Sequence, residues 1–303
     1  MKKKNGFFAI SIIFSFFIVF LMLITMNLTR YAQNRILLAQ VKKDIKNTSK
    51  LKVENHTLIC KRADITTLHT SYCGAEAGYG CNKIPGMNDT QMMTYGNQTT
   101  TSGTLNPGDA FDCDVDKDGV YDSELERFYF VSYLENDSNT AVFIYSNNTK
   151  ATSSTIINNN AGIPFSSNNT RKPDNAVTYL PFNDVWKNVS VKLPRNIMND
   201  NLETSVSGYS GYNGHSARLL TYRELSNACS RLYDCGWLFE NTKFDDSSLS
   251  DGYWMEYVSA TYYNAYYMSG TAVDIIPTSV TDSSIGVRPV IEVPKDRVEV
   301  NFK

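Results

Sequence analysis

Four aspartates lie within nine residues of the segment DCDVDKDGVYDSE, which covers positions 112–124. Three of them, Asp114, Asp116 and Asp118, alternate with other residues, and a glycine follows the third. In a calcium-binding loop, carboxylates at positions 1, 3 and 5, a glycine at 6, a backbone carbonyl at 7 and an acid at 9 surround the ion with oxygen. The spacing therefore predicts a Ca²⁺ site formed by these three carboxylates, the Val120 carbonyl and Asp122.

The loop departs from the calcium pattern at position 12, where Leu125 replaces the usual bidentate glutamate. Glu124 or Glu126 would have to supply that ligand. The alternative is a β-hairpin turn at 118–119, in which the glycine adopts a positive φ and the acids are solvated. The missing glutamate argues against calcium, whereas clustered carboxylates repel one another without a cation, which argues for it. Both interpretations therefore stay open at this point.

The rest of the sequence offers no pattern for catalysis. The histidines, His56, His69 and His215, are isolated, and no G-x-S-x-G or H-E-x-x-H motif occurs. The chain carries 29 basic and 31 acidic residues, but residues 1–46 have a net charge of +7 and the remainder of −9. An acidic domain repels a phosphate backbone. We therefore expect neither an enzyme nor a nucleic-acid-binding protein.

All six cysteines follow residue 59 and lie in segments rich in glycine, asparagine and serine. An even set in such segments is typical of disulfides formed in an oxidising compartment. The short spacing within NACSRLYDCGW favours a local Cys229–Cys235 bond. The four earlier cysteines allow three connectivities, of which we prefer Cys73–Cys81 with Cys60–Cys113.

A long apolar segment near the N-terminus precedes the cysteines and the aspartate loop. Residues Phe7–Met26 carry no charge, and a helix of that length spans about 30 Å, the thickness of a bilayer core. No glycine or proline interrupts the pattern before residue 47. A secretory signal peptide, the alternative, has a core of about 7–15 residues and a small-residue cleavage site, which is absent here. The sequence predicts one transmembrane helix that extends beyond the membrane.

For the rest of the chain, we expect a disulfide-rich loop region over residues 48–125, followed by a folded domain over residues 126–303. Residues 126–147 are typical of a β-hairpin, and four short strands follow from Gly252 onward. Helical stretches are expected near 182–188 and 222–231, and an exposed loop over 150–176. The predicted fold class is α+β.

The first residues read MKKKNGFFAIS, a short basic leader followed by Gly6, an aromatic Phe7 and the apolar helix. This order resembles the signal of type IV prepilins and pseudopilins. The resemblance implies a leader over 1–6, cleavage by a prepilin peptidase, methylation of the new N-terminus, and assembly with other pilin-like subunits through the helix 7–47. The chain departs from the family at Ser11, where pilins usually carry glutamate; the tip pseudopilin of type II secretion also lacks this glutamate.

Three segments carry a second resemblance, SARLLTYREL at 216–225, GYWMEYVSA at 252–260 and IGVRPVIEV at 285–293. They resemble the C-type-lectin-like domain shared by formylglycine-generating enzymes and bacterial surface modules. The resemblance implies a mixed α/β core without catalysis, because the reactive cysteine pair of those enzymes has no counterpart in residues 236–303. The framework residues are the capping-box pair Thr221 and Glu224, with Trp254, Gly286 and Arg288.

Together these features predict a long N-terminal transmembrane helix followed by a disulfide-rich extracellular domain with a C-type-lectin-like core. The leading hypothesis is a bacterial minor pilin or pseudopilin-like subunit that presents a lectin-like binding domain. The alternative is a stand-alone, membrane-anchored surface protein that binds a glycan or a protein outside any filament. In both, the N-terminus is cytoplasmic, the helix contacts membrane lipid, and residues 47–303 lie outside the cell.

Overall fold

The computed structural model describes residues 58–63, 69–72, 92–95, 105–151, 156–158, 161–230, 232, 235–243 and 248–299. The chain divides into two compact units, Met1–His56 and Thr57–Lys303, and every described residue belongs to the second. The predictions for the leader, for cleavage between Gly6 and Phe7 and for the helix 7–47 lie outside the described residues. Within the described residues, no helix is both long enough and apolar enough to cross a bilayer.

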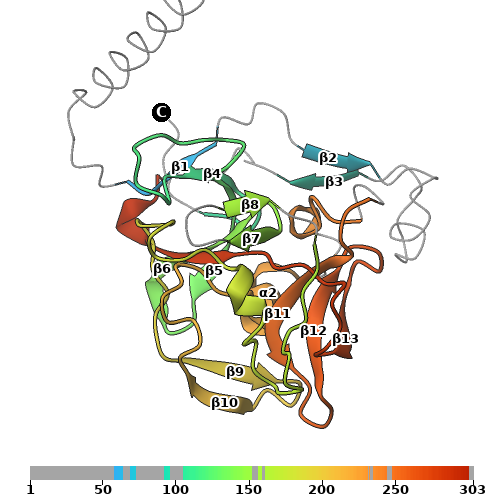
Figure 1. Ribbon diagram of the computed structural model, residues 1–303. Coiled ribbons are helices and arrows are strands. Elements are labelled where there is room, and N and C mark those ends of the chain that lie inside the picture. Colours follow the sequence, from blue (N-terminus) through green and yellow to red (C-terminus); the bar gives the residue numbers. More distant parts are fainter. Residues whose placement is uncertain are drawn as a thin grey trace, which may run out of the picture. The chain divides into compact units, whose positions relative to one another are not determined.

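The first of two five-stranded sheets has the order β1-β4-β5-β6-β14, and all of its neighbours pair antiparallel (Figure 1). Its centre is the predicted hairpin, with a turn after Leu134. The strands are β1 Cys60–Arg62, β4 Ala110–Cys113, β5 Arg127–Leu134, β6 Asp137–Tyr145 and β14 Val290–Pro294.

Strand β5 is buried on both faces, which explains its nearly continuous apolar sequence. Successive side chains of a strand point to opposite faces. Phe128 and Phe130 accordingly pack into one hydrophobic core, whereas Tyr129 and Val131 pack into a second. The first sheet therefore separates two cores.

The second sheet has the order β10-β9-β11-β12-β13. Its neighbours pair antiparallel except β9 and β11, which run parallel. The strands are β9 Arg195–Asn199, β10 Thr204–Tyr209, β11 Gly252–Val258, β12 Asn264–Ser269 and β13 Asp274–Ser279. The four strands expected from Gly252 onward are thus confirmed, three in this sheet and β14 in the other.

The remaining elements are short. Two small antiparallel pairs are β2 His69–Tyr72 with β3 Met92–Tyr95, and β7 Thr149–Ala151 with β8 Ile156–Asn158. The 3₁₀ helices of the described residues include η2 Ala176–Tyr179, η4 Gly236–Leu238 and η5 Lys295–Arg297. The α-helix α2, Tyr222–Ala228, contacts β5 of one sheet and β11 of the other and lies between them (Figure 1).

The capping box predicted at the start of α2 is confirmed. The Thr221 hydroxyl accepts a hydrogen bond from the Glu224 backbone N–H at 3.2 Å, and the Glu224 carboxylate accepts from the Thr221 N–H at 3.1 Å. The helix ends at Ala228, because Cys229 has an extended conformation and forms a disulfide with Cys235.

A second disulfide joins Cys60 of β1 to Cys113 of β4, which lie opposite each other in the ladder. These are two of the three pairings expected from the sequence. The third, Cys73–Cys81, lies outside the described residues. The first bond ties the three-residue strand β1 to β4, and the second ties the end of the seven-residue helix α2 to the start of η4.

Two predictions of local structure are wrong. Residues 182–188 form turns rather than a helix, because Phe182 pairs with His215 in an isolated β-bridge. The segment 150–176 is not simply an exposed loop. It contributes to β7 and β8, and the fully buried Phe165 packs edge-on against Trp254 with ring centroids 5.5 Å apart. With one α-helix in its described part, the domain is mostly β.

Candidate functional site

The aspartate loop connects β4 to β5, and its first residue, Asp114, is held by two hydrogen bonds of its backbone. The Asp114 backbone N–H donates to the Ile59 carbonyl at 2.9 Å, and the Asp114 carbonyl accepts from Nδ2 of Asn188 at 2.7 Å. Asp114 is only 1% exposed. The first expected ligand of the loop is therefore held from two sides by segments distant in the sequence.

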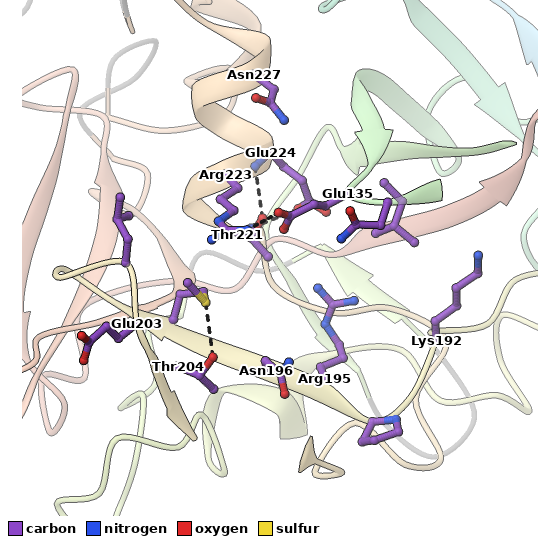
Figure 2. A pocket seen from close by; sticks show the side chains of 15 residues that line it. Glu135, Lys192, Arg195, Asn196, Glu203, Thr204, Thr221, Arg223, Glu224 and Asn227 are labelled. Carbon is purple, nitrogen blue, oxygen red and sulfur yellow. Dashed lines mark hydrogen bonds and ion pairs between the residues drawn. The ribbon is translucent and has the colours of Figure 1, made fainter. Parts of the chain in front are cut away.

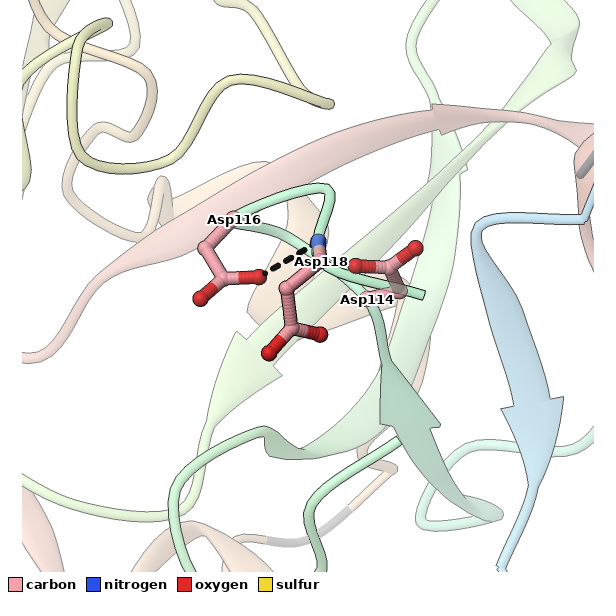
Figure 3. A group of neighbouring side chains, drawn as sticks. All are labelled: Asp114, Asp116 and Asp118. Carbon is pink, nitrogen blue, oxygen red and sulfur yellow. Dashed lines mark hydrogen bonds between the residues drawn. The ribbon is translucent and has the colours of Figure 1, made fainter. Parts of the chain in front are cut away.

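The carboxylates of Asp114, Asp116 and Asp118 converge. Each offers one oxygen, and the three oxygens lie within 4.8 Å of one another (Figure 3). Oδ1 of Asp116 accepts from the Asp118 N–H at 3.0 Å, and Gly119 has the positive φ, 84°, that its place in the turn requires. These three predicted ligands are brought together.

The electrostatics of the loop are unfavourable without a cation. Burial raises the pKa of Asp114, and the charges of Asp116 and Asp118 raise it further, against backbone N–H groups of Gly119 and Asp118 that lower it. Oδ1 of Asp114 is buried and has no hydrogen-bond partner among the described residues. The loop therefore contains a buried acceptor oxygen in a negative environment.

The predicted ligands Asp122 and Glu124 are not members of this carboxylate group. Oδ1 of Asp122 instead accepts from the backbone N–H groups of Glu124 and Leu125, at 2.7 and 3.1 Å. The side chain of Val120 is exposed, and its N–H donates to Oδ1 of Asp118 at 2.7 Å. The structure thus assembles the first half of the predicted ligand set.

Glu126, considered above as a possible twelfth-position ligand, has another role. Its Oε1 accepts from the Val115 N–H at 2.9 Å and its Oε2 from the Asp122 N–H at 3.1 Å. Burial raises the pKa of Glu126 to about 7, although these two hydrogen bonds lower it. The side chain closes the loop from inside by binding both of its ends.

A separate feature, which the sequence analysis did not predict, is a buried network of charged side chains. Arg218 donates from Nη1 to Glu224 at 2.8 Å and from Nε to Glu292 at 2.7 Å. Arg195 donates from Nη1 to the same oxygen of Glu292 at 2.9 Å, and its Nε lies 3.1 Å from Oε2 of Glu256. The network connects α2, β9, β11 and β14. The only sequence signal was the presence of acids inside otherwise apolar strands.

The members of this network respond differently to burial. Burial alone would raise the pKa of Glu224, but the charge and hydrogen bonds of Arg218 outweigh it and lower the pKa. Burial raises the pKa of Glu256, only partly offset by Arg195. Oε2 of Glu256 also accepts from the Tyr212 hydroxyl at 2.9 Å. The network fixes side chains rather than presenting a reactive group.

An open groove of about 640 Å³ lies beside this network, lined mostly by polar residues (Figure 2). Its walls are the β5–β6 turn, the segment that leads into β9, the β9–β10 turn and the N-terminal end of α2. Charged side chains at the wall are Glu135, Lys192, Arg195, Glu203, Arg223 and Glu224. Arg223 of α2 forms an ion pair with Glu135 of the β5–β6 turn, and both side chains are almost half exposed.

Two framework residues of the lectin-like resemblance, Trp254 and Arg288, are fully buried and donate hydrogen bonds to backbone carbonyls. Nε1 of Trp254 donates to the Ile163 carbonyl at 2.6 Å. Arg288 donates to the Leu238 and Glu240 carbonyls and lies over the ring of Tyr253. Through these contacts the two side chains hold together backbone segments that are distant in the sequence.

Gly286 lies where no side chain fits, because a Cβ there would come within 2.3 Å of Nδ2 of Asn148. Of the histidines, His215 donates from Nδ1 to the Leu180 carbonyl at 3.2 Å, and its ring stacks on Phe182 with ring centroids 4.5 Å apart. Its surroundings are those of a packing residue.

Comparison of the chain with models of protein families, with curated proteins and with solved structures gives no match.

Proposed function

We propose that this chain is a bacterial, pilin-like surface subunit whose β domain binds a polar ligand, foremost a glycan. The observation that carries the proposal is the open polar groove, because it combines a rigid base with charged side chains that a ligand can engage. The base is rigid since Arg195 and Glu224 are both held by the buried network.

The ion pairs at the rim of the groove can give up one partner to a bound ligand. Arg223 with Glu135, and Lys192 with Asp137, are exposed ion pairs, and such pairs contribute little to stability. A ligand rich in hydroxyl groups can therefore replace these partners at small cost. The lining contains no aromatic residue, so recognition would depend on hydrogen bonds rather than on stacking.

The placement outside the cell is supported by the disulfides and the N-terminal sequence. Disulfides persist in oxidising compartments, and both described bonds lie in the domain that follows the apolar segment. We propose that residues 7–47 anchor the chain and join a filament, that residues 47–303 are extracellular, and that residues 126–303 have a C-type-lectin-like core.

The N-terminus of the native chain tests the pilin half of the proposal. Mass spectrometry of protein extracted from membranes and surface filaments should find a chain that begins at Phe7 and carries an N-methyl group. A chain that retains Met1 would overturn this half. It would favour the stand-alone anchored binding protein, the alternative to which the departure at Ser11 points.

Binding of purified full-length protein in detergent to a glycan array tests the groove. We expect Arg223→Ala combined with Lys192→Ala to weaken binding about tenfold, the equivalent of ~1.4 kcal/mol. Arg297→Ala, which removes an exposed arginine of η5 outside the groove, is the matched control. Binding that survives the groove variant would contradict the proposal.

A further inference from the structure

We propose that the loop 114–118 binds a calcium ion through Asp114, Asp116 and Asp118, and that the ion fixes the loop against the start of β1. This inference is independent of the ligand-binding proposal, because the loop does not line the groove. It concerns how the domain is held together where the described chain enters it.

The spacing of the three carboxylates fits one ion without rearrangement. Calcium–oxygen distances are about 2.3–2.6 Å, so two ligands of one ion can be up to about 5.2 Å apart. The three oxygens lie within 4.8 Å of one another (Figure 3). A single cation can therefore touch all three side chains.

The buried oxygen of Asp114 is the second, independent observation. The side chain belongs to a residue that is 1% exposed, and its Oδ1 has no hydrogen-bond partner in the described part of the chain. Buried polar atoms are nearly always partnered, and an exception calls for an explanation such as an ion. Asp114 contributes one oxygen to the carboxylate group, so a cation there lies against its carboxylate.

The ligand set favours calcium over magnesium. Three carboxylates on one short loop form a negative, oxygen-only site of the kind that Ca²⁺ occupies with six to eight ligands. Magnesium keeps several of its waters and usually binds through one or two carboxylates. Asp118 is on the exposed side of the loop, so water can complete the coordination there.

The position of the loop determines what the ion would do. The Asp114 N–H donates to the Ile59 carbonyl at 2.9 Å, and the Tyr121 hydroxyl donates to the Leu58 carbonyl at 3.1 Å. The Lys61 ammonium group lies 3.9 Å from the centre of the Tyr121 ring. The first residue of the loop and Tyr121, which follows it, therefore contact the first residues of the described domain, and ordering the loop orders β1 with it.

Calorimetric titration of the full-length protein with CaCl₂, after chelation and in detergent, tests the site. We expect one ion per chain, with a Kd of about 10⁻⁴–10⁻³ M as in extracellular calcium modules. The thermal midpoint should rise with added Ca²⁺, because an ion that binds only the folded state stabilises it. Amide exchange of residues 58–62 and 114–126 should slow at the same time.

Variants identify the ligands. Asp116→Asn and Asp118→Asn change side chains that are not fully buried, and each should weaken binding at least tenfold; Asp114→Asn should abolish it. Asp274→Asn, an exposed aspartate of β13, is the matched control and should bind normally. Absence of heat and of a thermal shift at millimolar Ca²⁺, retention of binding in the loop variants, or equal binding of Mg²⁺ would overturn the proposal. None of these results depends on the groove.

Discussion

Nε of Arg218 donates to Oε1 of Glu292 at 2.7 Å, and neither side chain is more than 2% exposed. The same carboxylate oxygen accepts from Arg195 of the other sheet. Glu292 belongs to β14 and Arg195 to β9, so one buried oxygen joins the two sheets. Glu292 is therefore a polar link between the two sheets.

Glu292→Gln should destabilise the domain strongly. The substitution leaves two buried guanidinium groups without the charge they share, and breaking a buried ion pair in this way costs about 3–5 kcal/mol. Urea denaturation should report a loss of that size in the free energy of unfolding. Asp137→Asn, which breaks the exposed pair with Lys192, is the control and should have little effect. A similar loss for both variants would contradict the argument.

The stability of the protein should depend on the protonation of His215. Burial lowers the pKa of this histidine below its ordinary value of 6.5. The folded state then binds fewer protons than the unfolded state between the two pKa values, so this contribution to stability rises with pH up to about 6.5 and is constant above it.

The difference in melting temperature between the wild type and His215→Asn isolates this contribution. It should change in favour of the wild type as the pH rises to about 6.5 and remain constant at higher pH. Other titrating groups, including Glu126, are present in both proteins and cancel. A difference that is independent of pH from 5 to 8 would show that His215 keeps its ordinary pKa.

The two disulfides should differ in their effect on stability. Cys60–Cys113 closes a span of 53 residues and Cys229–Cys235 one of 6. In the chain-entropy account these closures contribute about 4 and about 2 kcal/mol. Replacing both cysteines of each pair by serine should lower the unfolding free energy in that proportion, measured under identical urea conditions. Equal losses would mean that contacts in the folded state, not the length of the closed loop, dominate.

Gly286→Ala should be poorly tolerated. The added methyl group would lie 2.3 Å from Nδ2 of Asn148, a side chain that bonds Ser250 and the Gly252 carbonyl. Overpacking of this kind costs about 1–3 kcal/mol. In a double-mutant cycle, Asn148→Ala should relieve part of the loss, because it removes the nearest clashing atoms and leaves only the Gly252 carbonyl, at 2.9 Å. Strictly additive losses would place the strain elsewhere.

The local elements with clear periodicity were predictable, and the buried charges were not. The hairpin 127–145 follows from two apolar runs separated by a polar turn, and the start of α2 follows from the Thr221 and Glu224 pair, because these signals depend on neighbours in the chain. The Arg218 network depends on residues about a hundred positions apart, and no local pattern marks an acid in a strand as buried and paired.

In the aspartate loop, too, the local arrangement could be predicted from the sequence, and the contact made by a more distant residue could not. The spacing placed Asp114, Asp116 and Asp118 together, since they are separated by single residues within one turn. It did not predict that Glu126 would close the loop through the N–H groups of Val115 and Asp122. That role depends on the return of the chain into β5, which the motif does not encode.

The Cys60–Cys113 bond has a mechanical consequence. If the chain is anchored at the cell surface, as we propose, a load on the domain acts through the chain at Leu58, the first residue of this domain that the structure describes. Strand β1 has only three residues and would peel from its neighbour under modest tension. Two residues after Leu58, however, the covalent bond transfers the pull to β4, which lies beside the central hairpin. Force applied to the chain thus passes through the disulfide to an inner strand of the sheet, and the hydrogen bonds of the short edge strand β1 carry almost none of it.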